Sequence, residues 1–226
     1  MPNYPHHVTQ RGTNKTDIFM CDKERLYFLQ SLKDYAHKAE VRIWAYCLMN
    51  NHFHLLLVPP KDHSLGRCIH GATFRYAQYF NRKYKRTGRL WQNRYFPCVV
   101  DKDGYLWSVV RYIERNPVRA NITEKAEDWK WSSVRAHMYG EKDYILSVND
   151  WLDDTEVSSY RDFIKNTGRE EEIRKVTSSG RPFGDVAFIE NLEYVLRRRL
   201  KPGKGGRPRE NKIIWGLFLS FMCNRK

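Results

Sequence analysis

The sequence predicts an α+β protein with a ferredoxin-like split βαβ core, a four- to five-stranded antiparallel sheet with helices, followed by a mainly helical C-terminal extension. Two observations predict this class. Short runs of alternating apolar residues, typical of strands, are separated by longer runs in which apolar residues recur at helical spacing. These runs follow the order strand, helix, strand, strand, helix, strand, which places two helices on one face of the sheet.

The first half of this core contains three predicted strands and one helix. Residues 6–11 form a strand, and Asp22 caps the helix that follows. One face of that helix carries Leu26, Leu29, Leu32 and Ala36. Residues 41–49 form a strand with apolar residues on both faces, which indicates that both faces are covered. One face carries Val41, Ile43, Ala45, Cys47 and Met49, the other Trp44, Tyr46 and Leu48. Residues 52–58 alternate in the same way and form the next strand.

The second half of the core contains two helices and a short strand. A long helix begins at Ser64, and residues 95–100 form the strand that follows it. The apolar stripe of the long helix consists of Leu65, Ile69, Ala72, Tyr76 and Phe80. A further helix runs from Gly104 to Asn116, where Pro117 limits it because proline has no amide donor. Its buried stripe consists of Leu106, Val109, Val110 and Ile113.

The remainder of the chain gives weaker signals. Residues 127–133 are typical of a loop whose tryptophans pack back on the core. Helices are expected over 162–175 and 188–200, and the stretch 177–185 between them has the composition of a linker. No internal repeat is found in the sequence.

The composition indicates a polyanionic partner. The 226 residues include 40 lysines and arginines against 26 acidic residues, which gives a net charge of +14, and the hydrophobic content of 41% disfavours disorder. Aromatic residues reach 14% and stack well on unpaired bases, so nucleic acid is favoured over a membrane surface. The alternative is a basic surface that only interacts with solvent.

Membrane insertion and secretion are both disfavoured. The longest apolar run, residues 213–223, is far shorter than the roughly 20 residues that a bilayer span needs. The five cysteines are odd in number and have no paired spacing, and the N-terminus lacks a signal pattern. We therefore expect a reduced, cytoplasmic protein whose cysteines are mostly small core residues.

Two histidines and a tyrosine are the candidates for chemistry. His52 and His54 are two residues apart on a predicted strand, so their imidazoles project from one face and could bind one metal ion. The alternative is that they only pack or hydrogen-bond within the sheet. Tyr112 and Asn116 are one helical turn apart and flank the buried stripe of their helix. A lone helical tyrosine more often packs than reacts, and spacing alone leaves both readings open.

These residues lie in motifs that resemble a known family. The motifs are HVTQRG, MNNHFHLLLVPP, YFNRKYKRTGRLWQNRY, RYIERNPVRAN, WKWSSVRAH and GRPFG. They resemble the HUH single-strand tyrosine transposases (IS200-like), and most closely the branch of REP-associated tyrosine transposases. The resemblance implies that His52 and His54 bind a divalent metal, that Asn116 completes the protein ligands and that Tyr112 is the nucleophile. It also implies a catalytic domain over residues 1–120, a helical extension over 121–200 and a basic, glycine-rich tail with a short apolar end over 201–226.

The resemblance implies a chemistry that suits these residue types. A metal ion withdraws charge from a phosphodiester and holds it in line for attack, and oxygen ligands favour Mg²⁺ or Mn²⁺. A tyrosine then forms a covalent 5′-phosphotyrosine and frees a 3′ hydroxyl. We therefore expect a metal-dependent endonuclease and strand transferase that cleaves single-stranded DNA near imperfect palindromes or hairpins and can rejoin the strands.

The expected DNA contacts lie in two basic segments. Residues 63–100 carry eight basic and no acidic side chains, interleaved with aromatic residues. The second segment is the tail, in which Arg-Pro-Arg resembles the core of an AT-hook. The expected contact residues are Arg82, Lys83, Tyr84, Lys85, Arg86, Arg89, Trp91, Arg94, Arg207 and Arg209.

Two other functions remain open from the sequence. One is a nucleic-acid-binding protein or regulator that is derived from such a transposase and has lost catalysis. The other is a replication initiator or relaxase, although these usually belong to longer chains. The expected partners are single-stranded or hairpin DNA and no membrane, with a location at the bacterial nucleoid. Both a monomer and a homodimer that exchanges the Tyr112 helix are compatible with the sequence.

Overall fold

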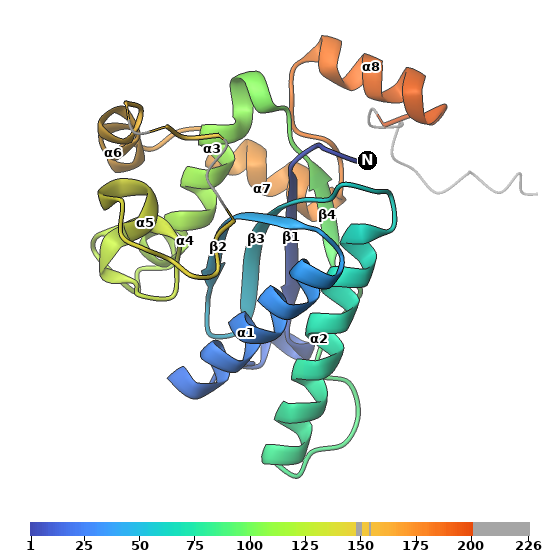
Figure 1. Ribbon diagram of the computed structural model, residues 1–226, viewed down its shortest axis with the longest axis vertical. Helices are drawn as coiled ribbons and strands as arrows, with labels where there is room; N and C mark the ends of the chain where they lie inside the picture. The colour runs from blue at the N-terminus through green and yellow to red at the C-terminus, as the bar shows by residue number, and fades with distance from the viewer. Residues whose placement is uncertain (148–150, 154, 201–226) are drawn as a thin grey trace, which may run out of the picture.

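A four-stranded antiparallel sheet forms the centre of the computed structural model, which describes residues 1–147, 151–153 and 155–200 (Figure 1). The spatial order of its strands is β2-β3-β1-β4, the order of a ferredoxin-like sheet, and the α+β class predicted from the sequence is confirmed. The strands are β1 (His6–Arg11), β2 (Arg42–Leu48), β3 (His52–Val58) and β4 (Phe96–Val99). The helices are α1 (Asp22–Lys38), α2 (Ser64–Lys83), α3 (Lys102–Glu114), α4 (Asn116–Arg119), α5 (Val134–Tyr139), α6 (Val157–Lys165), α7 (Glu170–Ser179) and α8 (Val186–Leu196), with short 3₁₀ turns at Thr13–Lys15 and Ala126–Asp128.

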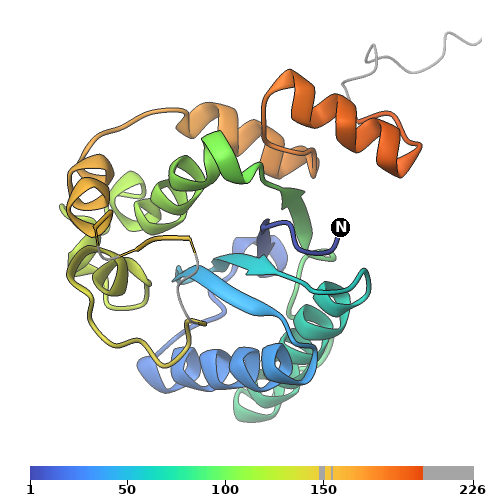
Figure 2. The ribbon, with the colours of Figure 1, turned by 45° about the horizontal axis from the view of Figure 1, so that its top comes forward.

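Helices cover both faces of the sheet. Figure 2 shows α1 and α2 on one side of the strands and α3 and α7 on the other. The first core lies under α1 and α2 and includes Phe28, Phe53 and Tyr76, whereas the second lies under α3 and includes Leu56, Val110 and residues of α5–α7. Because both faces are buried, the strands are apolar on both sides, as expected.

Two details of the first half differ from the prediction. Cys21, rather than Asp22, is the N-cap of α1, and the Glu24 carboxylate accepts hydrogen bonds from the backbone N–H groups of Met20 and Cys21. Leu26 is 58% exposed, whereas Phe28 is buried. Leu26 lies roughly 100° around the helix from the centre of the buried face, since each residue advances by about 100°.

A β-bulge in β2 changes the alternation of its side chains. The register with β3 shifts between Ile43 and Ala45. Trp44 and Ala45 consequently both pack in the second core, and Ile43 joins Tyr46 in the first. The predicted alternation, which placed Ile43 with Ala45, is wrong for this reason.

The helix predicted over 104–116 is two helices. α3 begins at Lys102 and ends at Glu114, and α4 begins at Asn116 after a turn at Arg115. Pro117 lies in the first turn of α4, where its missing N–H leaves no intrahelical bond unmade.

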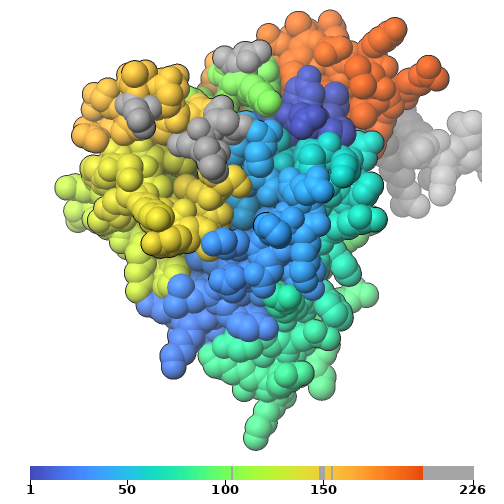
Figure 3. Space-filling model, viewed as in Figure 1, coloured from blue at the N-terminus to red at the C-terminus, as the bar shows by residue number. Residues whose placement is uncertain are grey.

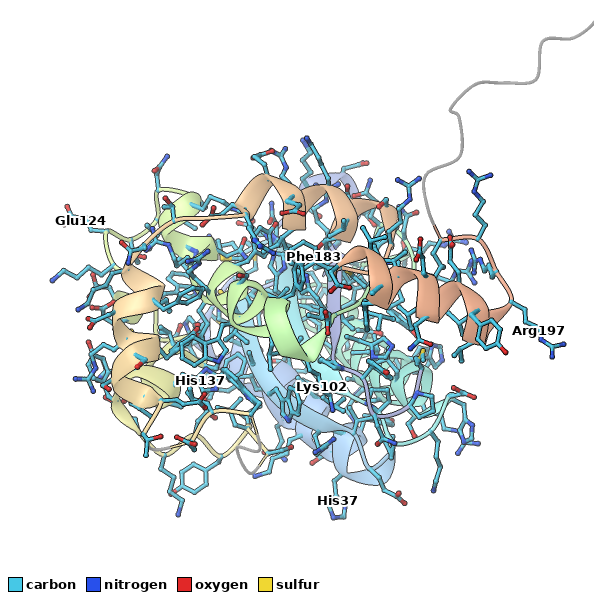
Figure 4. All side chains as sticks on the ribbon, turned by 90° about the horizontal axis from the view of Figure 1, so that it is seen from above. His37, Lys102, Glu124, His137, Phe183 and Arg197 are labelled. Carbon is cyan, nitrogen blue, oxygen red and sulfur yellow. The ribbon has the colours of Figure 1, made fainter. Side chains whose placement is uncertain are left out.

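Residues 121–200, which we call the extension, are more ordered than predicted. The helix expected over 162–175 is interrupted at 166–169 and becomes α6 and α7, and the helix expected over 188–200 is α8. The stretch 177–185 is not a linker. Phe183 is buried between α3 and α7 (Figure 4), its backbone N–H donates to Val99 O, and its carbonyl accepts from the N–H of Asp101.

The extension also packs along the opposite edge of the sheet. Backbone hydrogen bonds join Leu48 N to Trp131 O, Ser133 N to Tyr46 O and Ser147 N to Ile43 O. The tryptophans of this segment pack on the core, as expected. Figure 3 shows the yellow part of the extension, which precedes α6, directly against the blue residues of the first half of the chain. The division of the chain at residues 120 and 200 stays a prediction, and the tail lies outside the described residues.

Two further expectations concern cysteines and membrane spans. Cys47, Cys68 and Cys98 are buried as free thiols, which confirms that they act as small core residues. Within the described ranges, the structure contains no helix that is both long and apolar enough to cross a bilayer.

Candidate active site

The two histidines of β3 lie on the face of the sheet that looks toward α3. Their ring centroids are 5.0 Å apart, and His54 is buried whereas His52 is partly exposed. The Nδ1 atoms of both rings are engaged, His52 with Asn51 Oδ1 at 2.6 Å and His54 with Nε2 of His7 at 2.8 Å. Nε2 of each ring is therefore the atom that remains for a ligand.

Burial keeps these imidazoles neutral. Desolvation lowers the pKa of His52 to about 4, with smaller contributions from the nearby charges of Arg11 and Arg119. The pKa of His54 lies well below 6.5, mainly because of burial and also because of the neighbouring histidines and Arg119. A neutral imidazole is the form that binds metal ions, so the pair is ready for coordination at neutral pH.

Tyr112 of α3 faces the same group of imidazoles. Its ring is buried and lies edge-on to the rings of His54 and His7, each at 5.7 Å between centroids. The guanidinium of Arg119 in α4 lies over the Tyr112 ring at 4.2 Å. The fold thus brings together His52, His54 and Tyr112, which the sequence placed on two separate elements.

A cleft of about 520 Å³ opens at this point. Its lining includes Tyr112 and both histidines of β3. The basic residues that line it are Arg11, Lys15, Arg94, Arg119 and Arg174. Such a lining suits a phosphate backbone, because each guanidinium or ammonium can neutralise one phosphate.

Asn116 is close to Tyr112, but its side chain is paired elsewhere. Its Nδ2 donates to Tyr112 O at 2.9 Å, and its Oδ1 accepts from Nη2 of Arg119 at 2.7 Å. The side chain is buried and does not belong to the cleft lining. As a metal ligand, Asn116 would have to exchange its bond to Arg119 for one to the metal, so this role stays a prediction.

The residues present fit a divalent cation in part. Two neutral imidazoles on one face of a strand form a suitable pair of donors. Among the described residues, no cluster of three or more histidine, cysteine, aspartate or glutamate side chains could hold a metal ion. The remaining ligands would therefore be oxygen atoms of Asn116, of the substrate or of water.

Of the predicted DNA-binding residues between 82 and 94, Arg94 lies at this cleft, and the others lie at the end of α2 and in the loop that follows it. The loop after α2 is tied to the end of β1 by backbone bonds from Gln92 N to Arg11 O and from Thr13 N to Leu90 O. Arg94 lines the cleft itself. Arg82, Lys85, Arg86 and Arg89 are exposed.

Among the described residues, three of the predicted contact residues form side-chain hydrogen bonds within the protein. Lys83 and the hydroxyl of Tyr84 both bind the carboxylate of Glu24. Trp91 is partly buried, packs against Phe53 and donates its indole N–H to Thr73 O at 3.0 Å. Their contacts with DNA stay predictions, while Arg207 and Arg209 lie outside the described residues.

The sequence reasoning missed several residues of the cleft. Arg11 of the cleft lining and His7, buried behind it, belong to the motif HVTQRG, and Arg119 belongs to RYIERNPVRAN, so the motifs already contain these residues. Arg174 and Thr177 of α7 also line the cleft. Nothing in their local sequence indicates that α7 returns to the sheet.

The sheet presents two imidazoles to a tyrosine of α3, and comparisons with known proteins identify the class of protein as a transposase. The family of IS200-like transposases matches residues 2–116, about half of the chain, and the chain belongs to this family. A curated relative from Haemophilus influenzae, described as a REP-associated tyrosine transposase, is 26% identical over 163 residues, which are 62% of this chain and 92% of the relative.

A solved structure is similar in fold. It is that of a REP-associated tyrosine transposase bound to a REP hairpin, and it superposes with a TM-score of 0.52. The match covers 68% of this chain and 90% of that chain at 16% identity. The similarity supports the α+β architecture described above.

Proposed function

We propose that this chain is a metal-dependent DNA transposase that cleaves single-stranded DNA near hairpins or imperfect palindromes and rejoins the strands through Tyr112. The observation that carries the proposal is the position of the Tyr112 ring, edge-on to His54 in a cleft lined by basic residues. Membership of the IS200-like family supports the reaction class. The solved relative in complex with a REP hairpin supports folded single-stranded DNA as the substrate class.

The cleft would hold the scissile phosphate between Tyr112 and the imidazole pair. Arg11 and Arg94 lie on the strand side, whereas Arg119 and Arg174 come from the helices. Their positive charges attract the backbone on both sides of the phosphate. Burial of the Tyr112 ring restricts its motion, so that its hydroxyl is presented to the cleft in a limited set of directions.

The proposed reaction is a transesterification. The Tyr112 oxygen attacks the phosphorus, a new bond to the 5′ phosphate forms, and the bond from phosphorus to the 3′ oxygen breaks. The phenol proton passes, overall, to the departing 3′ oxygen, which becomes a hydroxyl. The reverse reaction, with a 3′ hydroxyl as the attacking group, rejoins strands without any energy-rich cofactor. Arg119, whose guanidinium lies over the Tyr112 ring, adds a positive charge to the cleft that would hold the phosphate.

The chain's own residues would also hold the cation. His52 and His54 would supply two nitrogen ligands, and Oδ1 of Asn116 would supply an oxygen if its hydrogen bond to Arg119 were broken. When bound, Mg²⁺ or Mn²⁺ withdraws charge from a non-bridging phosphate oxygen and fixes the phosphate in line with the nucleophile.

The test is the formation of a covalent complex with a hairpin oligonucleotide that carries a single-stranded flank, in the presence of Mn²⁺. The wild-type protein should give a band of raised mass on a denaturing gel, and Tyr112→Phe should give none. Tyr105→Phe, on the same helix and packed against Phe183, is the matched control and should retain the band.

Two results would contradict the proposal. A covalent complex with Tyr112→Phe would remove Tyr112 as the nucleophile. Tight hairpin binding by the wild-type protein without cleavage in any divalent metal would favour the alternative of a DNA-binding protein without catalysis.

A further inference from the structure

A third histidine lies directly behind the imidazole pair. His7 of β1 is fully buried, and its Nε2 is 2.8 Å from Nδ1 of His54. The two rings are stacked, with centroids 5.1 Å apart and an angle of 21° between their planes. Nδ1 of His7 is in turn 3.0 Å from Oγ1 of Thr177 in α7. A buried chain of hydrogen bonds thus connects Thr177 to His7 and His7 to His54.

The sheet and α7 position the members of this chain. In the antiparallel pairing of β1 with β3, His7 is opposite Leu56, so His54 is its diagonal neighbour on the same face. Diagonal neighbours are within reach of long side chains. Thr177 comes from the extension, 170 residues away from His7 in the sequence. The backbone pairing of Phe183 with the end of β4 fixes the segment that follows α7.

We propose that His7 and Thr177 are positioning residues that hold His54 with its proton on Nδ1 and its lone pair on Nε2, toward the cleft. In this arrangement the N–H of His54 Nδ1 donates to Nε2 of His7. The N–H of His7 Nδ1 then donates to the hydroxyl oxygen of Thr177. The inference rests on the proposed metal-dependent function and names the residues that prepare His54 for it.

Two features of the cleft favour this direction of the hydrogen bonds. His52 donates from Nδ1 to the carboxamide oxygen of Asn51, so its own Nε2 carries a lone pair. The opposite direction in the His7 chain would put a proton on Nε2 of His54, where it would block a cation. The guanidinium of Arg119 also lines the cleft, and a positive charge there favours lone pairs over N–H groups.

Outer hydrogen-bond partners of this kind matter for metal sites. A histidine ligand whose second nitrogen is hydrogen-bonded has a fixed tautomer and ring orientation, and loss of that partner costs about 10- to 100-fold in metal affinity. Arg174, Thr177 and Ser178 of α7 all line the cleft, beyond the family match at residues 2–116. The extension therefore contributes to the site and does not only pack against the core.

The first experiment determines the tautomer of His54 by NMR. Long-range ¹H–¹⁵N correlation spectra of the metal-free protein at neutral pH distinguish a proton on Nδ1 from one on Nε2. We expect Nδ1–H for His54 in the wild-type protein and a mixture in His7→Phe. His6→Gln is the matched control, because His6 is a buried neighbour on β1 that bonds to Tyr4 O instead, and it should leave His54 unchanged.

The second experiment measures metal affinity without DNA, by titration of the metal-free protein with Mn²⁺ or Co²⁺. His7→Phe should raise the Kd by about 10- to 100-fold. His7→Gln should restore most of the affinity, because its side-chain oxygen can accept from His54 Nδ1. Thr177→Val should weaken binding less than His7→Phe, and Ser179→Ala, two residues further along α7 and outside the cleft lining, should leave the Kd unchanged. Circular dichroism checks folding, and His7→Gln and Thr177→Val carry the test if His7→Phe does not fold.

The outcomes separate this inference from the proposed function. A proton on Nε2 of His54 in the wild-type protein, or an unchanged tautomer and Kd in the folded His7 and Thr177 variants, would overturn the positioning role. Tyr112-dependent cleavage would still stand in that case. Conversely, a covalent complex formed by Tyr112→Phe would overturn the proposed nucleophile and leave the tautomer of His54 as a separate result.

Discussion

Glu114, at the C-terminal end of α3, should be the most important polar residue for the stability of the extension. It is fully buried, and its carboxyl group accepts hydrogen bonds from Ser133 at 2.6 Å and from Tyr160 at 2.7 Å. It also lies 2.6 Å from Nδ1 of His137 in α5. One side chain thus connects the helix that carries Tyr112 to α5, α6 and the segment between α4 and α5.

The loss of stability in Glu114→Ala follows from the buried hydrogen-bond donors that would be left without an acceptor. Ser133 can turn to Tyr46 O, which is already 3.3 Å from its hydroxyl, so His137 and Tyr160 are the two groups left without an acceptor. Burial keeps the pKa of Tyr160 well above 10, so its hydroxyl remains a donor. A buried donor without a partner costs about 1 to 3 kcal/mol. Two such donors predict a loss of about 4 kcal/mol in the free energy of unfolding, and Glu114→Gln, which keeps one acceptor oxygen, should lose about half of that.

Urea unfolding followed by tryptophan fluorescence measures this loss. Glu141→Ala is the matched control, because Glu141 is exposed and its partner in the described part of the chain is Arg135, and the unfolding free energy of this variant should stay close to that of the wild-type protein. A loss below about 1 kcal/mol for Glu114→Ala, or the same loss in both variants, would refute the reasoning.

Three other predictions concern pH, subunit exchange and salt. Burial lowers the pKa of His6 to about 4, so the unfolded chain binds more protons than the folded protein between pH 4 and 6.5. His6 should therefore lower the free energy of unfolding by about 2 kcal/mol between pH 7 and pH 5. Denaturation of His6→Gln at the two pH values should show a correspondingly smaller loss. Because Tyr112 packs against the imidazoles of its own chain, a mixture of Tyr112→Phe and His52→Ala should not regain cleavage, and recovered activity would indicate exchange between subunits. Arg86 is exposed, whereas Lys83 pairs with Glu24 at 2.6 Å. Arg86→Gln should therefore reduce the slope of single-strand affinity against salt concentration by about 0.7, and Lys83→Gln should change this slope less. Equal slopes for both variants would contradict the expectation that Arg86 contacts DNA and Lys83 does not.

The architecture could be predicted because local patterns determine it. The apolar stripe of α2 and the alternation in β3 each follow one periodicity without interruption, and both predictions are confirmed. The bulge at Trp44 and the break at Arg115 could not be predicted, because each depends on the neighbouring strand or helix against which the segment packs.

The candidate site was predictable only where it lies in short motifs. His52, His54 and Tyr112 belong to patterns with a fixed spacing, and the fold brings them to one cleft. His7 and Thr177 have no mutual spacing that could indicate contact, since the sheet and the return of α7 bring them together. The hydrogen bond between Asn116 and Arg119 likewise could not be predicted, because both residues lie in α4 and the sequence did not indicate the break between α3 and α4.

The extension hydrogen-bonds to both edge strands of the sheet, and this has a consequence for the solubility of shortened chains. Residues 131–133 and 147 hydrogen-bond to β2, and Phe183 bonds to the end of β4. An uncovered edge strand offers its free N–H and C=O groups to strands of other molecules and promotes aggregation. A chain that ends at residue 120 would expose β2 and β4 together, with apolar side chains on both faces. We therefore expect the shortened chain to aggregate more readily than a chain that retains the extension.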